Sequence, residues 1–329
     1  MPVFGCREAK RTHGTGFRQE SSHACISAKL KGAVLAMNDF LELIVGATAS
    51  GCVYALVALS YLLITRPTGI INFAVGEWGM LGAFGGYLAL SRAGLPYAVS
   101  MVLVLAGMFA IGWATERLTV RPLVERGAPP LAPILALLGM LVVFREVISV
   151  TIGPDPQPVP PAFGFGRLEL GLLAGSYQSF FIITVTAVVF AAVWYFFERT
   201  LAGKSFEAVA IDRRAAALMG INLRRVTAMA FAASASVAGL AGLLVAPNAS
   251  AHYLMGIPLA IQGFTALVIG GVGRVEGALL GGMILAFVEQ FTVRYAPIPP
   301  GLAQGVPLVL LILFLLIRPT GLLRARETR

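Results

Sequence analysis

The sequence predicts an all-α polytopic membrane protein with about 8–9 transmembrane helices, some of them broken or re-entrant. Three observations support this class. Hydrophobic residues make up 57% of the 329-residue chain and charged residues only 12%, about half the charged share of a soluble domain. The mean hydropathy is +0.83. Apolar runs of about 20 residues follow one another, and each is long enough to cross a bilayer as a helix.

The expected spans, in chain order, cover residues 40–65, 70–91, 96–114, 131–152, 177–197, 222–245, 259–272, 275–291 and 302–317. The first span stops at Arg66-Pro67, because arginine suits a helix C-terminus and proline prevents simple continuation. The first half of the second span is unusually polar. Its second half carries Gly82-x-x-x-Gly86, a spacing that lets another helix approach closely.

The third span is followed by a loop that carries Arg117, Arg121 and Arg126. Near the far end of the fourth span, Arg145 and Glu146 are adjacent and therefore point in different directions on a helix, so we interpret both as outer-interface residues. The connection after this span is rich in proline and glycine and has no helical pattern.

Asn222 is the expected N-cap of the sixth span. Residues 246–258 then interrupt the apolar pattern. The segment 259–272 is short for a full crossing, so a broken or re-entrant segment is the alternative there.

The stretch 199–225 holds six basic residues in 27 and lies between two spans. Such a charge density belongs in water beside the membrane, and an excess of Arg and Lys marks the cytoplasmic side. If successive spans cross the membrane in alternate directions from this stretch, the segments between residues 37 and 329 place 15 basic residues on the cytoplasmic side and 3 on the outer side. We therefore expect a multi-pass protein of a bacterial-type cytoplasmic membrane, with the N-terminus outside and the C-terminus cytoplasmic.

Within this stretch, Ser205 is expected to cap a short helix that ends at Gly220. Ile211, Ala215 and Leu218 would share one face of that helix. Residue spacing leaves two interpretations open. The helix fits either a groove on a partner protein or the surface of lipid headgroups.

Several classes of function are excluded by missing motifs. The sequence Ala202-Gly203-Lys204-Ser205 lacks the upstream glycine of a P-loop, and no metalloprotease or serine-hydrolase motif occurs. The three cysteines have no metal-ligand spacing. The net charge of +9 resides at the ends of apolar runs, which argues against nucleic-acid binding. We expect no enzyme, no cofactor and no metal.

Residues 1–36 stand apart from the rest of the chain. They carry six basic and two acidic residues and no apolar run, and they lack the apolar core of a signal peptide. We interpret them as a tag or an over-long start, with a real basic arm as the alternative. Residues 37–329 would form a single transmembrane domain.

Four segments carry a family resemblance: GIINFAVGEWGMLGAF (69–84), AAALMGINLRRVTAMAF with ASVAGLAG (215–242), VIGGVGRVEGALLGG (268–282) and RPTGLL (318–323). With them, the chain from Met37 onward resembles the permease subunits of branched-chain amino-acid ABC importers, the LivH class. It departs from the family pattern at Val75, where histidine is usual, and at Arg274 and Glu276, where serine and proline are frequent.

The resemblance implies a multi-subunit importer. The expected partners are two cytoplasmic ABC ATPase subunits that bind the ATP, a second homologous permease, an extracytoplasmic substrate-binding protein and the lipid bilayer. The charged helix would then be the coupling helix that contacts the ATPase. Its expected contact residues are Ser205, Glu207, Asp212, Arg213, Arg214, Ala215, Ala216, Ala217 and Gly220.

The expected function is translocation of branched-chain amino acids, or of related amino acids, amides or urea. Polar residues in apolar spans are the candidates for the path, because each is costly in lipid unless it lines a cavity or pairs. They are Asn72, Glu77, Asn248, His252 and Gln262, with Glu289 and Gln290 as further possibilities. The alternative function is an ATP-independent channel or ion-coupled transporter for a small polar solute.

Overall fold

A computed structural model describes residues 17–129, 131–164, 166–170, 173–271, 273–295, 299, 305–318 and 321–322. Six helices in this described part are long and apolar enough to cross a membrane. They are α1 (Phe17–Thr68), α3 (Tyr97–Thr115), α5 (Leu131–Thr151), α6 (Tyr177–Arg199), α9 (Leu223–Ala249) and α11 (Val275–Tyr295). The predicted class, a helical polytopic membrane protein, is confirmed.

Three shorter helices complete the bundle: α2 (Val75–Gly86), α10 (Gly256–Gly270) and α13 (Val306–Ile317). A π-helical turn, η1 (Tyr87–Arg92), continues α2. At 15 residues, α10 is about 22 Å long, shorter than the hydrocarbon layer of about 30 Å. The expectation that this segment is short for a full crossing is confirmed, although it begins at Gly256 rather than at residue 259.

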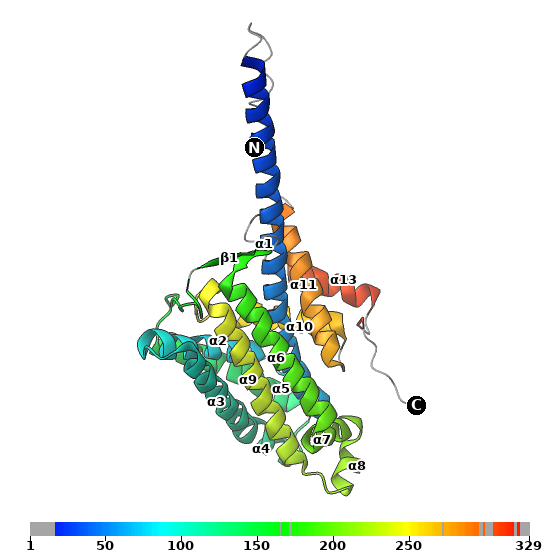
Figure 1. The fold of residues 1–329 in the computed structure, drawn as a ribbon. Helices are drawn as coiled ribbons and strands as arrows, with labels where there is room; N and C mark the ends of the chain where they lie inside the picture. The colour runs from blue at the N-terminus through cyan, green and yellow to red at the C-terminus, as the bar shows by residue number, and fades with distance from the viewer. Residues whose placement is uncertain are drawn as a thin grey trace.

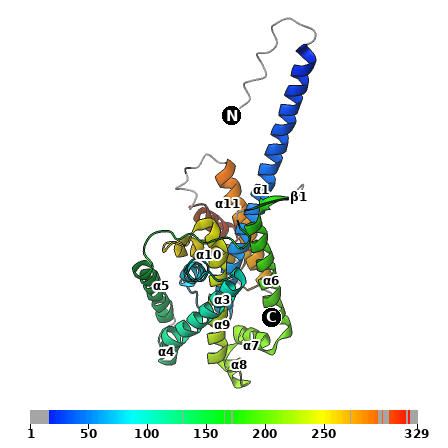
Figure 2. The same ribbon diagram turned by 60° about the vertical axis from the view of Figure 1, so that its left-hand side comes forward.

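The centre of the bundle is formed by α1 and α9. Their most apolar windows are 72% and 78% buried, whereas those of α5 and α6 are 17% buried. Figure 2 shows α5 at the periphery of the bundle, and the N-terminal part of α1 extends beyond the bundle (Figure 1). In a membrane protein the exposed apolar faces of α5 and α6 suit contact with lipid or another membrane chain.

Glycines bring α2 directly onto α9. A Cβ built at Gly82 would collide with the backbone of Gly239, and one at Gly242 would collide with the backbone of Gly79. Only glycine permits this approach, since backbone rather than a movable side chain lies opposite. The predicted packing role of Gly82 is confirmed.

Several boundaries differ from expectation. The loop predicted at 115–127 is helical, because α3 passes through η2 (Glu116–Val120) into α4 (Arg121–Glu125). Pro122 lies in the first turn of α4, where its missing N–H is tolerated, and the helical stretch ends before Gly127, whose φ is +68°. The first helix begins at Phe17, but the part of it that can cross a membrane, Asp39–Thr68, agrees with the span predicted at residues 40–65.

The connection between α5 and α6 contains an antiparallel hairpin of β1 (Arg167–Leu170) and β2 (Leu173–Ser176). Sequence analysis did not predict this hairpin. The N-cap prediction for the sixth span is confirmed, because the Asn222 side chain accepts a hydrogen bond of 3.2 Å from the backbone N–H of Arg225. That span, α9, continues to Ala249 rather than ending near residue 245.

Polar contacts join helix ends at each of the two ends of the bundle. At one end, here called the loop face, the pairs are Arg66 with Gly273, Arg213 with Thr68 and Arg224 with Glu125. At the other end the pairs are Arg294 with Asp39 and Ser91 with Pro158. The segments predicted to share a side of the membrane are thus in contact with one another.

Candidate functional site

The charged loop between α6 and α9 folds into two short helices, α7 (Leu201–Ile211) and α8 (Arg213–Leu218). Thr200 caps α7, since its hydroxyl accepts a 3.0 Å hydrogen bond from the N–H of Gly203. The predicted capping role of Ser205 is wrong. That residue lies inside α7, and its hydroxyl donates to the carbonyl of Leu201 at 2.9 Å. Sequence analysis missed Thr200, which stands directly after the last residue of α6.

One face of α7 is fixed to the membrane domain. Phe206 and Val209 are buried, and the ring of Phe206 packs edge-on against Phe196 and Phe197 at the end of α6. A Cβ at Gly203 would collide with the backbone of Phe196, so glycine is needed where α7 folds back on α6. The helix is therefore packed against the end of α6 by one face.

Asp212 separates the two helices and caps the second. Its carboxylate accepts hydrogen bonds from the N–H groups of Arg214 at 2.7 Å and Ala215 at 3.0 Å. The backbone N–H groups of Ala215 and Arg214 hold the pKa of this exposed carboxyl below its ordinary value. Gly220 follows α8 with a φ of +85°, a conformation that favours glycine. The single predicted helix is thus two helices, ended as predicted near Gly220.

Four large apolar side chains of α7, α8 and the turn that follows α8 are exposed. Their exposed fractions are 89% for Leu201, 84% for Ile211, 88% for Leu218 and 84% for Met219. We call these four residues the exposed apolar patch. None of these four was among the predicted contact residues. Of the predicted set, Arg213, Arg214, Ala215 and Ala217 are exposed, Glu207 pairs with Lys204, and Ala216 is buried. This arrangement suits contact with a protein surface.

The segment is also tied to the ends of other helices. Arg213 donates to the carbonyl of Thr68 at 3.4 Å. Arg66, at the end of α1, donates to the carbonyl of Gly273 and lies over the ring of Phe197, 5.5 Å from its centroid. Movement of α7–α8 would therefore act directly on α1 and, through Arg66 of α1, on the turn between α10 and α11. Sequence analysis identified Arg66 only as a helix end.

Glu77 lies in the first turn of α2 and is 1% exposed. The guanidinium of Arg145 on α5 donates to its Oε1 at 2.6 Å. A Cβ at Gly256 would lie 2.5 Å from Oε2, so the carboxylate rests on the backbone at the start of α10. The interpretation of Arg145 as an outer-interface residue is wrong, because it points into the bundle, whereas Glu146 is exposed.

The other predicted path residues lie at separate places. Asn72 precedes α2 and accepts a 2.9 Å hydrogen bond from the N–H of Ala74. Asn248 is exposed in the last turn of α9, and His252 is partly buried just after that helix. Gln262 on α10 donates to Glu289 on α11 at 3.4 Å. Among the hydrogen bonds and ion pairs of the described residues, none joins two of the five predicted path residues.

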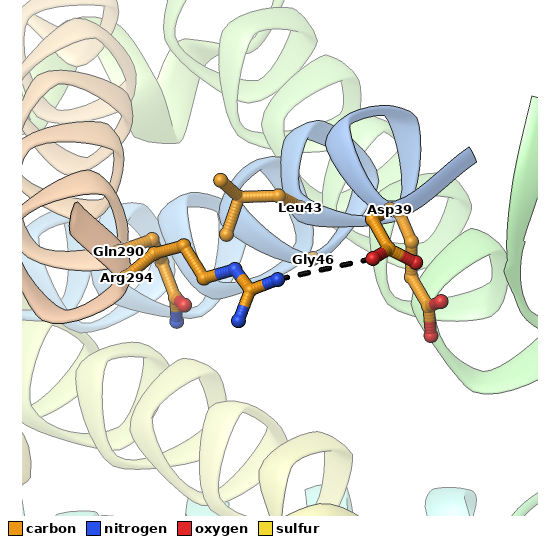
Figure 3. Close-up of a pocket in the computed structure, with 6 residues that line it drawn as sticks. Asp39, Leu43, Gly46, Gln290 and Arg294 are labelled. Carbon is orange, nitrogen blue, oxygen red and sulfur yellow. Dashed lines mark ion pairs between the residues drawn. The ribbon is translucent and has the colours of Figure 1, made fainter. Parts of the chain in front are cut away.

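A pocket opens between the ends of α1 and α11, on the side opposite the loop face (Figure 3). Its volume is about 340 Å³, and it is lined by Asp39, Glu42, Leu43, Gly46, Gln290 and Arg294. Arg294 faces Asp39 across it at 3.8 Å. None of the five predicted path residues lines this pocket.

The six described helices that are long and apolar enough to cross a bilayer define an integral membrane protein. The family described as "Branched-chain amino acid transport system / permease component" matches residues 43–315, and the chain belongs to this family. The resemblance found in the sequence is thereby confirmed.

Three curated relatives illustrate the range of the similarity. The high-affinity branched-chain amino acid transport system permease protein BraD of Pseudomonas aeruginosa is 30% identical over 88% of this chain and 97% of its own length. The corresponding protein LivH of Escherichia coli K12 is 31% identical over 88% and 96%. The ribose import permease protein RbsC of Escherichia coli K12 is 28% identical over 72% and 74%.

Among solved structures, PsaBC from Streptococcus pneumoniae in complex with Fab covers 84% of this chain and 91% of its own. The TM-score is 0.48 and the sequence identity is 13%.

Proposed function

We propose that the chain is the membrane-spanning permease of an ATP-driven importer for branched-chain amino acids or closely related amino acids. Family membership supports the transport role. The observation that carries the ATP-driven mechanism is the exposed apolar patch of Leu201, Ile211, Leu218 and Met219, held on a helical loop. Large apolar side chains fixed in water suit a groove on a cytoplasmic partner.

The proposed partners are two ATPase subunits, a second homologous permease and an extracytoplasmic substrate-binding protein. ATP would be bound by the ATPase subunits, since residues 202–205 lack the upstream glycine of a phosphate-binding loop. ATP-driven movement of the ATPases would change the contact with α7–α8. Only a contact that differs between two states can shift the permease between them.

In the proposed orientation the loop face is cytoplasmic, the N-terminus is outside and the C-terminus is inside. The distribution of basic residues supports this orientation, since 15 are expected on the loop side and 3 on the other. The pairing of Arg66 with Gly273 and of Arg224 with Glu125 gathers these segments at one face.

The proposed translocation path passes the polar residues Asn72, Glu77, Asn248, His252 and Gln262. Glu77 is the strongest of these, because it is buried and paired with Arg145 of another helix, and paired ionisable residues inside membrane segments often mark a substrate pathway. Asn72 supports the proposal in a similar way, since it is 1% exposed and its amide nitrogen has no hydrogen-bond partner.

The test places a charge in the exposed apolar patch and measures ATP-driven uptake of leucine by the assembled transporter in proteoliposomes. Leu218→Arg should lower uptake about 30-fold, the loss typical of a central contact residue, without affecting membrane insertion. Val124→Arg, at an exposed site on the same face but outside α7–α8, is the matched control. Normal uptake by Leu218→Arg would exclude the proposed coupling contact.

A further inference from the structure

The buried ion pair between Glu77 and Arg145 leaves bonding capacity unused on both partners. Glu77 Oε2 and Arg145 Nε are each buried without a hydrogen-bond partner, although Oε1 of Glu77 receives the guanidinium at 2.6 Å. Buried polar atoms are nearly always paired in folded proteins. An unpaired acceptor and an unpaired donor on the two partners of one ion pair would both be satisfied by a ligand that carries a donor and an acceptor.

We propose that this pair is the point at which the permease recognises the charged backbone of its substrate, an inference that rests on the proposed function. A free α-amino acid presents an ammonium group and a carboxylate on adjacent atoms. The ammonium matches the unpaired oxygen of Glu77, and the carboxylate matches the unpaired N–H of Arg145. A neutral sugar offers neither charge, so the site would select amino acids over such solutes.

The position of the pair between separate elements supports a binding role. Glu77 belongs to α2, Arg145 to the peripheral helix α5, and Gly256 starts α10 directly against the carboxylate. The N-terminus of α10 adds a favourable dipole for a negative charge. Stability alone is a weak reason to keep such a pair, because a well-packed apolar pair of similar volume is often as stable.

The surroundings of the pair suit an apolar substrate side chain. Met80 follows Glu77 by three residues on α2, and Ile148 follows Arg145 by three residues on α5, so each lies on the same helix face as its partner. Met255 directly precedes Gly256. All three belong to one buried apolar cluster. Methionine adapts its shape readily, so this cluster can repack around branched side chains of different form.

The experiment compares neutral replacements of two buried ion pairs in the assembled transporter. The test variant is the double substitution Glu77→Gln with Arg145→Met. The control is Glu116→Gln with Arg121→Met, since that pair is 3.1 Å apart and is also partly buried, with no unpaired buried atom. Leucine uptake and ATP hydrolysis stimulated by the loaded binding protein are measured for each.

The proposal predicts that the test variant assembles and hydrolyses ATP while leucine uptake falls about 10- to 100-fold, and that the control keeps near-normal uptake. Normal uptake by the test variant would overturn the inference and leave the proposed function intact. Absence of ATP-driven uptake by the unmodified assembly would overturn the proposed function itself.

A second measurement uses the unmodified protein, in case the test variant does not assemble. Phenylglyoxal modifies arginine side chains, and mass spectrometry reports modification at each arginine. Saturating leucine should reduce modification of Arg145 at least several-fold, as expected when a carboxylate occupies the guanidinium. Arg121 should be unaffected. Labelling of Arg145 that is the same with and without leucine would contradict the proposal.

Discussion

Arg145 on α5 and Glu77 on α2 form an ion pair of 2.6 Å across 68 residues of sequence. Glu77 is almost fully buried, and Arg145 is 18% exposed. The pair attaches a helix that otherwise lies at the edge of the bundle (Figure 2). It is therefore a charged link between α2 and α5.

The pair should behave non-additively in stability measurements. Glu77→Gln or Arg145→Met alone leaves one buried charge without its partner, at a cost of about 3–5 kcal/mol. The double variant should lose much less free energy of unfolding than the two single variants do in sum, because no unpaired charge remains. The free energies of unfolding of the original protein, the two single variants and the double variant are compared by heat or denaturant unfolding in detergent. Strictly additive losses of stability would show that the two side chains do not interact.

The contact between α2 and α9 should not tolerate a single added methyl group. Gly82→Ala places a Cβ against the backbone of Gly239, and we expect a loss of about 1–3 kcal/mol from overpacking. Gly107→Ala is the matched control, because nothing lies within 4 Å of its Cβ position. Thermal unfolding separates them, and equal stability of the two variants would contradict the close approach.

Ser60 on α1 and Ser234 on α9 are fully buried and bonded to each other. The hydroxyl of Ser60 donates to the carbonyl of Ser234 at 2.9 Å, and the hydroxyl of Ser234 donates to the carbonyl of Ser60 at 2.7 Å. Ser60→Ala and Ser234→Ala each remove one of these bonds, so each should lower the free energy of unfolding by about 1 kcal/mol in thermal or denaturant unfolding. Unchanged stability of both variants would mean that these bonds do not help to join the two central helices.

The start of α8 should respond to acid through Asp212. The folded state lowers the pKa of this carboxyl below its ordinary value of 3.8. Its stabilising effect is therefore complete above that pH and is lost as the pH falls through the lower, folded value. Hydrogen exchange at the amides of Arg214 and Ala215, corrected for intrinsic rates, should rise in that window. Asp212→Asn keeps a cap that does not titrate, so a similar rise in that variant would exclude Asp212 as the cause.

Much of the fold could be predicted from the sequence, because apolar length alone defines a membrane helix. The spans that became α5, α6 and α11 were placed to within a few residues at most ends. The N-cap at Asn222 followed from local chemistry. The end of α3 was less predictable, because Pro122 lies where a new helix can begin, and helical structure therefore continues through residues expected to form a loop.

The candidate site was only partly predictable. The charged stretch 199–225 identified a helical loop outside the membrane, but the break at Asp212 and the cap at Thr200 depend on backbone geometry. The partner of Glu77 could not be found, since nothing in the sequence links positions 68 residues apart. Arg145 and Glu146 are adjacent and point in different directions on a helix, and both were assigned to an outer interface. Adjacency does not show which of the two faces the bundle, so the inward position of Arg145 was missed.

The central claim is that α7–α8 joins this permease to an ATP-hydrolysing partner. The most direct measurement is affinity isolation of the full chain from native membranes in mild detergent, with every co-purifying chain identified by mass spectrometry. We predict recovery of an ATPase with an intact phosphate-binding loop, and loss of that subunit with Leu218→Arg but not with Val124→Arg. Recovery of this chain alone, active in transport without ATP, would contradict the claim and favour an ion-coupled transporter or channel.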